Sequence, residues 1–276
     1  DLIPEFNEGF TDYTYEDTII NNTTTRSIYS DNLPTRIRFG ADSESNKTLS
    51  LLEVIYLNTN NLTTMSSMFK RCHNVTTINT NGWDISNVDS MYETFYKCLS
   101  LEEIDVSSFD TSNVVTMDAT FYRCNNLTNI IGIENWDTSN VTNMSWMFTD
   151  CESLTKLDLN WDTGKVTDMS YMFSISSDSG CYLLEELNVS SWNVANVTNM
   201  FEMFYGCASL EELDVSNWDT SNVTDMNSVF CDCESLKSLD VSNWETNKVT
   251  NMAWLFEDCN SLTALDLSNW DVSNVT

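Results

Sequence analysis

The chain has 276 residues, and its 12 Lys and Arg against 42 Asp and Glu give a formal net charge of −30. A surface of this charge repels phosphate backbones and anionic lipid headgroups and attracts cations and basic proteins, so we expect neither nucleic acid nor a membrane surface as a partner. No apolar run approaches the roughly 18 residues that a membrane span needs, so we expect no membrane insertion in this segment.

Residues 1–50 contain both prolines and aromatic, Thr-rich stretches such as "GFTDYTYEDTII". Stretches of this kind predict β-strands. We expect an N-terminal cap that covers the end of the repeats that follow, with a small separate strand-rich module as the alternative.

From residue 51 to residue 276 the chain is repetitive. A Met followed four residues later by a Phe recurs at intervals of 26, 26, 27, 25, 31, 26 and 26 residues. These methionines are Met65, Met91, Met117, Met144, Met169, Met200, Met226 and Met252. A Trp or Phe eight residues before most of them, and a Cys with an aliphatic residue three positions later, recur with the same period. Such a period predicts stacked repeat units.

Each unit has two halves with different apolar spacing. "LEELDVSNW" (210–218) alternates in its middle, as a short strand does, whereas "NVTDMNSVF" (222–230) places apolar residues three and four positions apart, as one face of a helix does. We therefore predict an α/β solenoid, a leucine-rich-repeat-like right-handed stack with a parallel β-sheet on one face and short helices on the other. It would have about eight coils, the last one incomplete. The chain begins at Asp1 and stops before the next Met and Phe, so we expect a piece of a longer repeat.

The recurring "WDTSNVTxM" and "MFxxCxSL" signatures resemble those of the BspA-like leucine-rich-repeat surface proteins over residues 52–276. The resemblance implies a cell-surface or secreted protein that adheres to host, matrix or neighbouring-cell proteins. It places the chain outside the cell, with extracellular proteins or glycans as partners. The alternative is a self-assembling structural component of a surface layer, filament or virion appendage, which would associate with its own copies.

Aromatic residues occupy positions that vary between units, and we predict that they face outward. The position two after the Met holds Trp146, Tyr171 and Trp254 but Ser, Glu or Ala in other units, and the position after the Phe holds Tyr96 and Tyr122. Exposed aromatic residues in a row are candidates for a protein or glycan contact. The alternative is partial packing between neighbouring coils.

Acidic residues line the outward side of the predicted strands, and we consider Glu186, Glu212, Asp214 and Asp240 as binding candidates. Ca²⁺ is a weak candidate ligand where carboxylates crowd two adjacent coils, namely Glu185, Glu186, Glu211, Glu212 and Asp214. The competing interpretation is a solvated ladder in which Ser hydroxyls bridge the carboxylates. No other cofactor is indicated.

Eight of the nine cysteines share one column that we predict to be inward, as small buried hydrophobic residues, with disulfide pairing between coils as the alternative. Cys231 falls in an outward column and is a candidate for reaction or cross-linking. His73 is the only histidine, and the chain has no nucleophile elbow, phosphate loop or HExxH motif. We therefore expect neither enzymatic activity nor catalytic residues.

Overall fold

The computed structural model describes residues 59–175 and 181–276, together with the backbone of five strands nearer the N-terminus. These are β1 (Glu5–Phe6), β2 (Thr14–Ile20), β3 (Thr23–Tyr29), β4 (Ile37–Arg38) and β5 (Glu53–Val54). Strand β1 pairs antiparallel with β4, and β2 pairs antiparallel with β3. Strands therefore form where the sequence predicts them, whereas the predicted capping role of residues 1–50 lies outside the described residues.

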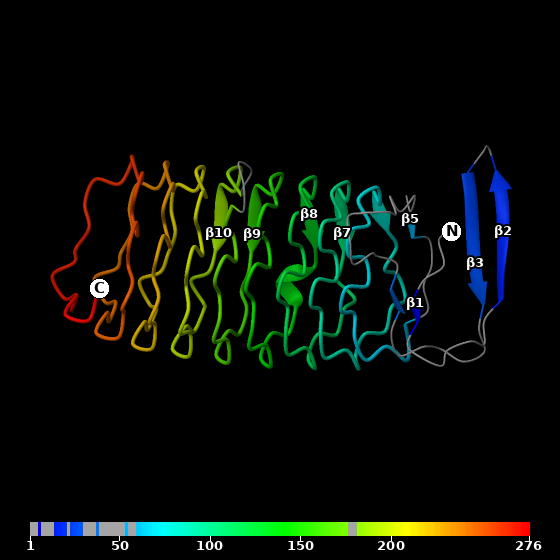
Figure 1. Ribbon diagram of the computed structural model, residues 1–276, viewed down its shortest axis with the longest axis horizontal. Helices are drawn as coiled ribbons and strands as arrows, with labels where there is room; N and C mark the ends of the chain where they lie inside the picture. Colours follow the sequence, from blue (N-terminus) through cyan, green and yellow to red (C-terminus); the bar gives the residue numbers. More distant parts are fainter. Residues whose placement is uncertain are drawn as a thin grey trace.

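The repeat region is a stack of coils arranged side by side along one long axis (Figure 1). Its strands are β6 (Thr77–Ile78), β7 (Glu103–Asp105), β8 (Asn129–Ile131), β9 (Lys156–Asp158) and β10 (Glu186–Asn188). The pairs β5–β6, β7–β8 and β9–β10 are all parallel. A stack with short parallel strand pairs is thus confirmed.

Alternation of side chains explains why these segments are extended. In β7, Ile104 is buried while its neighbours Glu103 and Asp105 are exposed, and β9 and β10 repeat this pattern around Leu157 and Leu187. A strand that points one apolar side chain inward and two polar ones outward cannot bury that side chain alone. Stacking the coils completes its burial.

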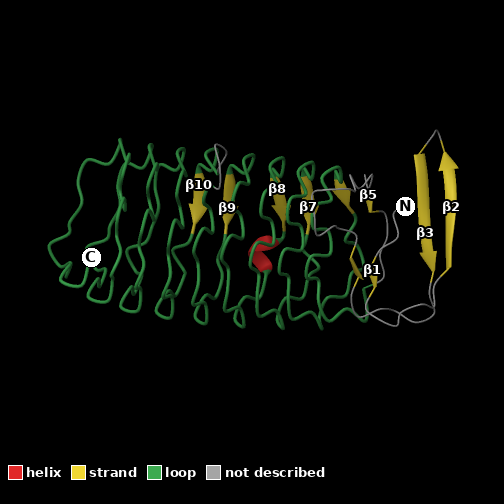
Figure 2. Ribbon diagram, viewed as in Figure 1, coloured by secondary structure: helices red, strands yellow, loops and turns green. Residues whose placement is uncertain are grey.

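The predicted short helices are wrong. In the part of the chain that the structure describes, the one helical element is the 3-10 turn η1 (Ile133–Asn135), and no helix there is long and apolar enough to cross a membrane (Figure 2). In the segment predicted to be helical, the N–H groups of Met226, Ser228 and Phe230 donate to carbonyls of the next coil at 2.8, 2.9 and 3.0 Å. An α-helix would direct them to the residue four positions earlier.

Backbone conformation explains why the apolar spacing imitates a helix. The residue two positions after the Met has a positive φ in all eight coils, for example 59° at Trp146 and 53° at Ser228. These left-handed residues belong to a run of consecutive turns, in which N–H groups such as those of Cys231 and Cys233 donate to the carbonyl three residues earlier, so that side chains three and four positions apart point inward. The apolar residues were assigned correctly, since Val223, Met226 and Phe230 are fully buried, but their period has a different cause.

Two ladders of aromatic rings fill the core. One consists of the Phe that lies four residues after the repeated Met of each coil. The centroids of adjacent rings in this ladder are 5.3 to 5.8 Å apart. The other contains Trp83, Phe109, Trp136, Trp161, Trp192, Trp218, Trp244 and Trp270, with centroids 5.8 to 6.4 Å apart. Each stacked pair stabilises the fold by about 0.5–1.5 kcal/mol beyond the burial of its area.

The motif "WDTSNVT" ties each coil to both of its neighbours. The carboxylate of Asp137 accepts the N–H of Ser139 at 3.0 Å, and these hydrogen bonds from Ser139 hold the pKa of Asp137 below its usual value. The hydroxyl of Thr138 donates to the backbone carbonyl of Asp162 in the following coil at 2.8 Å. The side-chain amide of Asn140 donates to the backbone carbonyl of Ser112 in the preceding coil, also at 2.8 Å. The motif is therefore scaffold.

The cysteines form a further inward column. All nine are free thiols, and in the ladder each Sγ donates to the carbonyl of the Phe in the preceding coil at 3.0–3.6 Å, from Cys98 through Cys259. Cys231 does not face outward as predicted. It is 7 % exposed, and burial together with nearby carboxylates raises its pKa to about 12.

Candidate binding surface

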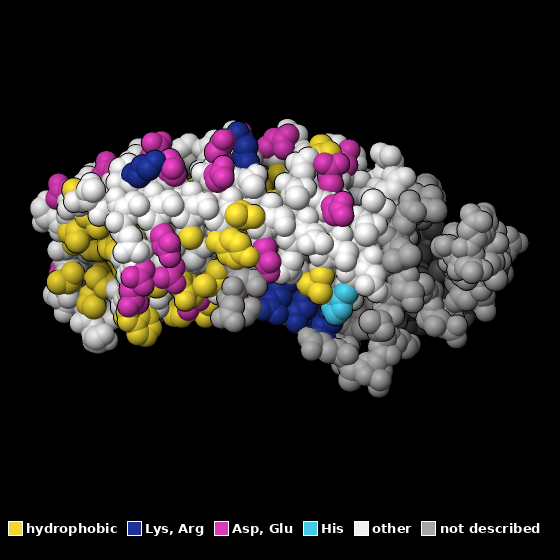
Figure 3. Space-filling view, turned by 90° about the horizontal axis from the view of Figure 1, so that it is seen from above, with side chains coloured by type: hydrophobic (Ala, Val, Ile, Leu, Met, Phe, Trp, Pro, Cys, Tyr) yellow, Lys and Arg dark blue, Asp and Glu magenta, His cyan; other side chains and the backbone are white. Residues whose placement is uncertain are grey.

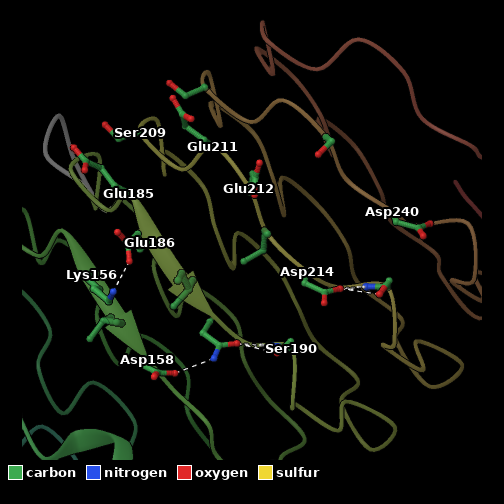
Figure 4. Close-up of a pocket in the computed structure, with 17 residues that line it drawn as sticks. Lys156, Asp158, Glu185, Glu186, Ser190, Ser209, Glu211, Glu212, Asp214 and Asp240 are labelled. Atoms are coloured by element: carbon green, nitrogen blue, oxygen red, sulfur yellow. Dashed lines mark hydrogen bonds and ion pairs between the residues drawn. The ribbon is translucent and has the colours of Figure 1, made fainter.

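An open groove crosses the strand face of several coils, and its rim is mostly acidic and hydroxylic (Figure 4). The four acidic residues that the sequence suggested for binding all line it, namely Glu186, Glu212, Asp214 and Asp240. Strands β9 and β10 and the equivalent extended segments of the next coils position them, because these residues alternate with buried Leu and Val side chains.

The carboxylates of this groove each interact with a nearby Lys or Ser and do not point toward one common position. Glu186 forms an ion pair with Lys156, Glu211 with Lys237, and Asp214 accepts the hydroxyl of Ser216 at 2.7 Å. Within residues 59–175 and 181–276, no group of three or more Asp, Glu, His or Cys side chains is placed to hold a metal ion. The weak Ca²⁺ candidate is thus corrected: Glu185, Glu186, Glu211, Glu212 and Asp214 do not form one ligand set.

In several coils an acidic residue of the ladder accepts hydrogen bonds from a Ser of the same coil. Asp240 accepts both the hydroxyl and the N–H of Ser242, at 2.7 and 3.1 Å, and these hydrogen bonds lower the pKa of Asp240. Asp105 and Ser107 repeat the arrangement in another coil. These hydrogen bonds stabilise the turn that follows the strand segment. The ion pairs Lys156–Glu186 and Lys237–Glu211 are exposed and therefore contribute little to stability.

A second surface lies on a different edge of the coils and contains a row of aromatic side chains. We call it the aromatic row: Tyr96, Tyr122, Trp146, Tyr171 and Phe201. The ring centroids of consecutive members are 4.6, 5.9, 3.6 and 4.9 Å apart. All five side chains are half-buried. The structure thus brings together four of the five aromatic candidates. Their rings pack between neighbouring coils, as the alternative interpretation predicts, and remain partly exposed, whereas a contact with a protein or glycan stays a prediction.

Trp254, the fifth aromatic candidate, lies away from the row. It is 63 % exposed in the last coil, where Leu255, Phe256 and Trp270 are its apolar neighbours. Glu202 and Ser228 occupy its column in the two preceding coils, and Ser228 is buried. Trp254 therefore lies outside the aromatic row.

Four cations adjoin the aromatic row. We call them the basic cluster: Lys70, Arg71, Lys97 and Arg123. Figure 3 shows Lys and Arg side chains gathered beside the single His along one edge. Lys70 Nζ and Lys97 Nζ lie 5.1 and 5.6 Å from the ring centroid of Tyr96, and Arg123 Cζ lies 5.9 Å from that of Tyr122. These are cation–π distances.

Carboxylates support the basic cluster from beneath. Glu93, 8 % exposed, forms an ion pair with Lys70, and fully buried Asp150 accepts from Nε of Arg123 at 2.8 Å. Burial of Tyr96 and the charge of Glu93 raise the pKa of the Tyr96 hydroxyl, while a hydrogen bond with Arg71 opposes this shift. Asp150 thus lies beneath the partly exposed Arg123, whereas Lys70 and Glu93 are both largely buried.

The repeat itself is matched by a known family. Residues 46–132, 89–179, 120–212 and 177–276 each match the model of the family described as Mycoplasma protein of unknown function, DUF285. The chain belongs to this family. A search of curated proteins and a search of solved structures found no match. The match is thus to a repeat family under this description, and the more specific BspA-like leucine-rich-repeat resemblance goes beyond it.

Sequence reasoning missed the basic cluster, although a signal for it exists in the DUF285 repeats of this chain. The position six residues after the Met reads Arg71, Lys97 and Arg123 in the first three coils and Asp150 in the fourth. The core positions stay nearly constant over the same coils. The positive charge is therefore confined to one edge of these coils, while their core residues stay nearly the same.

Proposed function

We propose that this chain is a non-covalent recognition scaffold, displayed outside a cell, that binds host, matrix or neighbouring-cell proteins or their glycans. The observation that carries the proposal is the aromatic row, five half-buried rings on consecutive coils beside four cations. Tyr, Trp and Arg are the residues most enriched at the energetic centres of protein interfaces. A stack that needed only to support itself could place small polar residues there, as other coils do.

Two further observations support an extracellular role. The recurring motifs resemble those of BspA-like surface proteins, for which adhesion is the implied function. A net charge of −30 keeps an elongated repeat protein soluble and discourages nonspecific association with anionic surfaces. Binding would therefore depend on a local surface that is less acidic than the rest of the chain.

The test is a binding screen of the purified, monomeric chain against extracellular matrix proteins and glycans, run with Ca²⁺ and with a chelator. We expect a saturable partner whose affinity falls by about 30-fold when Trp146 and Tyr171 are both replaced by Ser, as for residues at the centre of an interface. Trp254→Ser is the matched control, because it removes an exposed Trp outside the row. Unchanged binding by the double variant would exclude the aromatic row as the contact.

Self-assembly into a structural component is the second candidate, and one observation favours it. The column that holds Arg71, Lys97 and Arg123 holds Asp232 and Asp258 nearer the C-terminus, and Figure 3 shows acidic side chains toward that end of the edge. Complementary patches of this kind can join copies head to tail. Sedimentation at increasing concentration separates the candidates: a mass that grows favours assembly, and a monomer that binds a foreign partner favours recognition.

A further inference from the structure

The second core ladder contains an unbroken run of indole rings. Six of its tryptophans follow one another in consecutive coils, and we call them the tryptophan array: Trp136, Trp161, Trp192, Trp218, Trp244 and Trp270. Their ring centroids are 6.2 to 6.3 Å apart, and the planes of neighbouring rings are inclined by 1 to 8°. These values are those of offset stacking, in which neighbouring π-systems overlap.

The two ends of the array differ in their access to solvent. Indole gives up an electron more readily than the ring of Phe, so the array ends electronically at Phe109, which stacks on Trp136 at 6.4 Å. At the other end, Trp270 is half-buried and lines an apolar pocket of the last coil. The other five indoles are at most 4 % exposed. An oxidant in solution therefore meets the array at Trp270.

The core keeps an oxidised indole from losing its proton. The Nε1–H group becomes acidic once an electron is removed, but a base or water must accept the proton. Nε1 of Trp161 and of Trp192 donates to a backbone carbonyl of the preceding coil, at 3.0 and 2.7 Å, and a carbonyl is too weak a base. Nε1 of Trp136 and of Trp218 has no hydrogen-bond partner in the part of the chain that the structure describes. The radical cation therefore remains protonated.

The surroundings of the array also favour movement of the positive charge. Burial opposes a charge at each of these indoles to a similar degree, so transfer from one ring to the next changes the free energy little. The carbonyl that accepts from Nε1 of Trp161, Trp192 or Trp244 directs the negative end of its dipole at the ring. The net charge of −30 lowers the cost of a positive charge inside the protein.

We infer that the tryptophan array conducts single-electron vacancies through the core between Trp270 and Trp136. A one-electron oxidant takes an electron from Trp270 and leaves an indole radical cation. Trp244 then gives an electron to Trp270, and each further transfer moves the vacancy by one coil until a one-electron reductant refills it. No bond forms or breaks, and no proton leaves the chain. This activity uses only the core and is independent of the proposed recognition function.

The test places an oxidant beside one end of the array. Val272 is 56 % exposed and lines the same pocket as Trp270, so a ruthenium(II) polypyridyl maleimide attached through Val272→Cys lies next to it. Cys259→Ser removes the half-buried native thiol, and the other eight are buried. Illumination with an irreversible cobalt(III) electron acceptor generates ruthenium(III), which oxidises Trp270. Tandem mass spectrometry then measures oxygen addition at each Trp.

An interruption of the array identifies the route. In the labelled chain we expect oxidation products at the three members farthest from the label: Trp136, Trp161 and Trp192. Trp218→Phe should lower their yield by at least about tenfold, because a higher barrier slows a step exponentially. This substitution removes no hydrogen bond among the described residues, and Phe109 already occupies the same ladder.

Trp83→Phe is the matched control and should leave these yields unchanged. It makes the same substitution in the same ladder, at an indole whose Nε1 also has no partner within the described residues, but on the far side of Phe109. Urea unfolding verifies that both variants fold. If Trp218→Phe does not, Trp192→Phe replaces it, with the products measured at Trp136 and Trp161.

Two outcomes overturn the inference. One is the absence of products at the three far tryptophans of the labelled chain. The other is an equal yield there in the interrupted variant and in Trp83→Phe, since the oxidant would then reach these rings by a route other than the array. Neither outcome depends on whether the binding screen finds a partner, so vacancy transport and recognition fail separately.

Discussion

Trp146 and Tyr171, one coil apart, stack with ring centroids 3.6 Å apart and planes inclined by 15°. This is a shorter centroid distance than that of any pair in the two core ladders, where the minimum is 5.3 Å. Both residues have a φ of 59°, and their N–H groups donate to the next coil at 2.9 and 2.8 Å. The backbone ladder thus holds two left-handed residues in place and directs their side chains to the surface.

Replacing this pair should cost little stability. Because the rings are half-buried, we expect Trp146→Ser with Tyr171→Ser to lower the free energy of unfolding by no more than about 2 kcal/mol. Phe148→Ala, in the fully buried ladder, should lower it by about 3–5 kcal/mol. Urea denaturation of both variants measures the difference. Equal losses would show that the aromatic row belongs to the core.

The sequence was sufficient for the stack and its inward columns, because Met, Phe, Cys and Trp recur at one period. Leu210, Leu213 and Val215 are buried as their alternation predicts. The helix prediction was wrong because the apolar spacing reports only which side chains point inward. A left-handed residue in each coil, such as Ser228, produces the same spacing as a helix, and a non-Gly residue gives no composition signal for that conformation.

The binding surfaces were harder to predict for a related reason. Trp146 and Tyr171 stood out because each is large, but Lys70, Lys97 and Arg123 are single cations at variable positions. These cations come together through contacts between neighbouring coils. One such contact joins Lys70, five residues after Met65, to Glu93, two residues after Met91. A column-by-column comparison of charge would have found the basic cluster. The ion pairs that separate the groove carboxylates become visible only in the structure.

The cysteine ladder should be chemically inert while the chain is folded. Burial raises the pKa of Cys72, Cys124 and Cys181 to about 12, so roughly one thiol in ten thousand is a thiolate at pH 8. We expect negligible reaction of the native chain with Ellman's reagent and reaction of all nine thiols in urea. Half-buried Cys259, whose pKa is raised to about 11, should react first.

Cys231 provides the decisive comparison in the same assay. Its buried position beside Glu257, with 3.9 Å between Sγ and Oε2, predicts that it reacts no faster than the ladder thiols. Cys231→Ser should therefore leave the native reaction rate unchanged. A clear loss of rapid reaction in this variant would restore Cys231 as an accessible cross-linking site.

Asp118 should make stability increase as the pH falls from 7 toward 5. Burial, with the charges of Glu93 and Asp168, raises the pKa of Asp118 from 3.8 to about 6, although a hydrogen bond with Ser145 opposes the shift. The folded chain therefore takes up a proton at a pH where the unfolded chain does not. Its stabilisation is complete below pH 3.8 and is lost as the pH rises through about 6.

Asp118→Asn should reduce this pH dependence and stabilise the chain at pH 7 by about 1 kcal/mol, a figure lowered to allow for solvent screening of a half-buried group. Asp105→Asn is the control, because hydrogen bonds from Ser107 lower the pKa of Asp105 and its effect on stability falls below pH 4. Urea midpoints at pH 5, 6 and 7 provide the measurement. Identical slopes in wild type and Asp118→Asn would contradict the assignment.

Two glycines with the same backbone conformation should differ sharply in their tolerance of a side chain. Gly82 and Gly132 have φ values of 78° and 84°, so any residue with a Cβ is strained at both. A Cβ at Gly82 meets no atom within 4 Å, whereas a Cβ at Gly132 overlaps the backbone of Ser107 in the preceding coil.

The overlap arises where β8 meets η1, since the Gly at this junction allows the chain to pass close to the coil of β7. Gly82→Ala should lower the free energy of unfolding by about 1 kcal/mol, the cost of the left-handed conformation alone. Gly132→Ala adds a clash with backbone that cannot rotate away, and should cost roughly 3 kcal/mol or more. Urea unfolding of the two variants decides the matter, because equal costs would mean that the two coils separate without penalty.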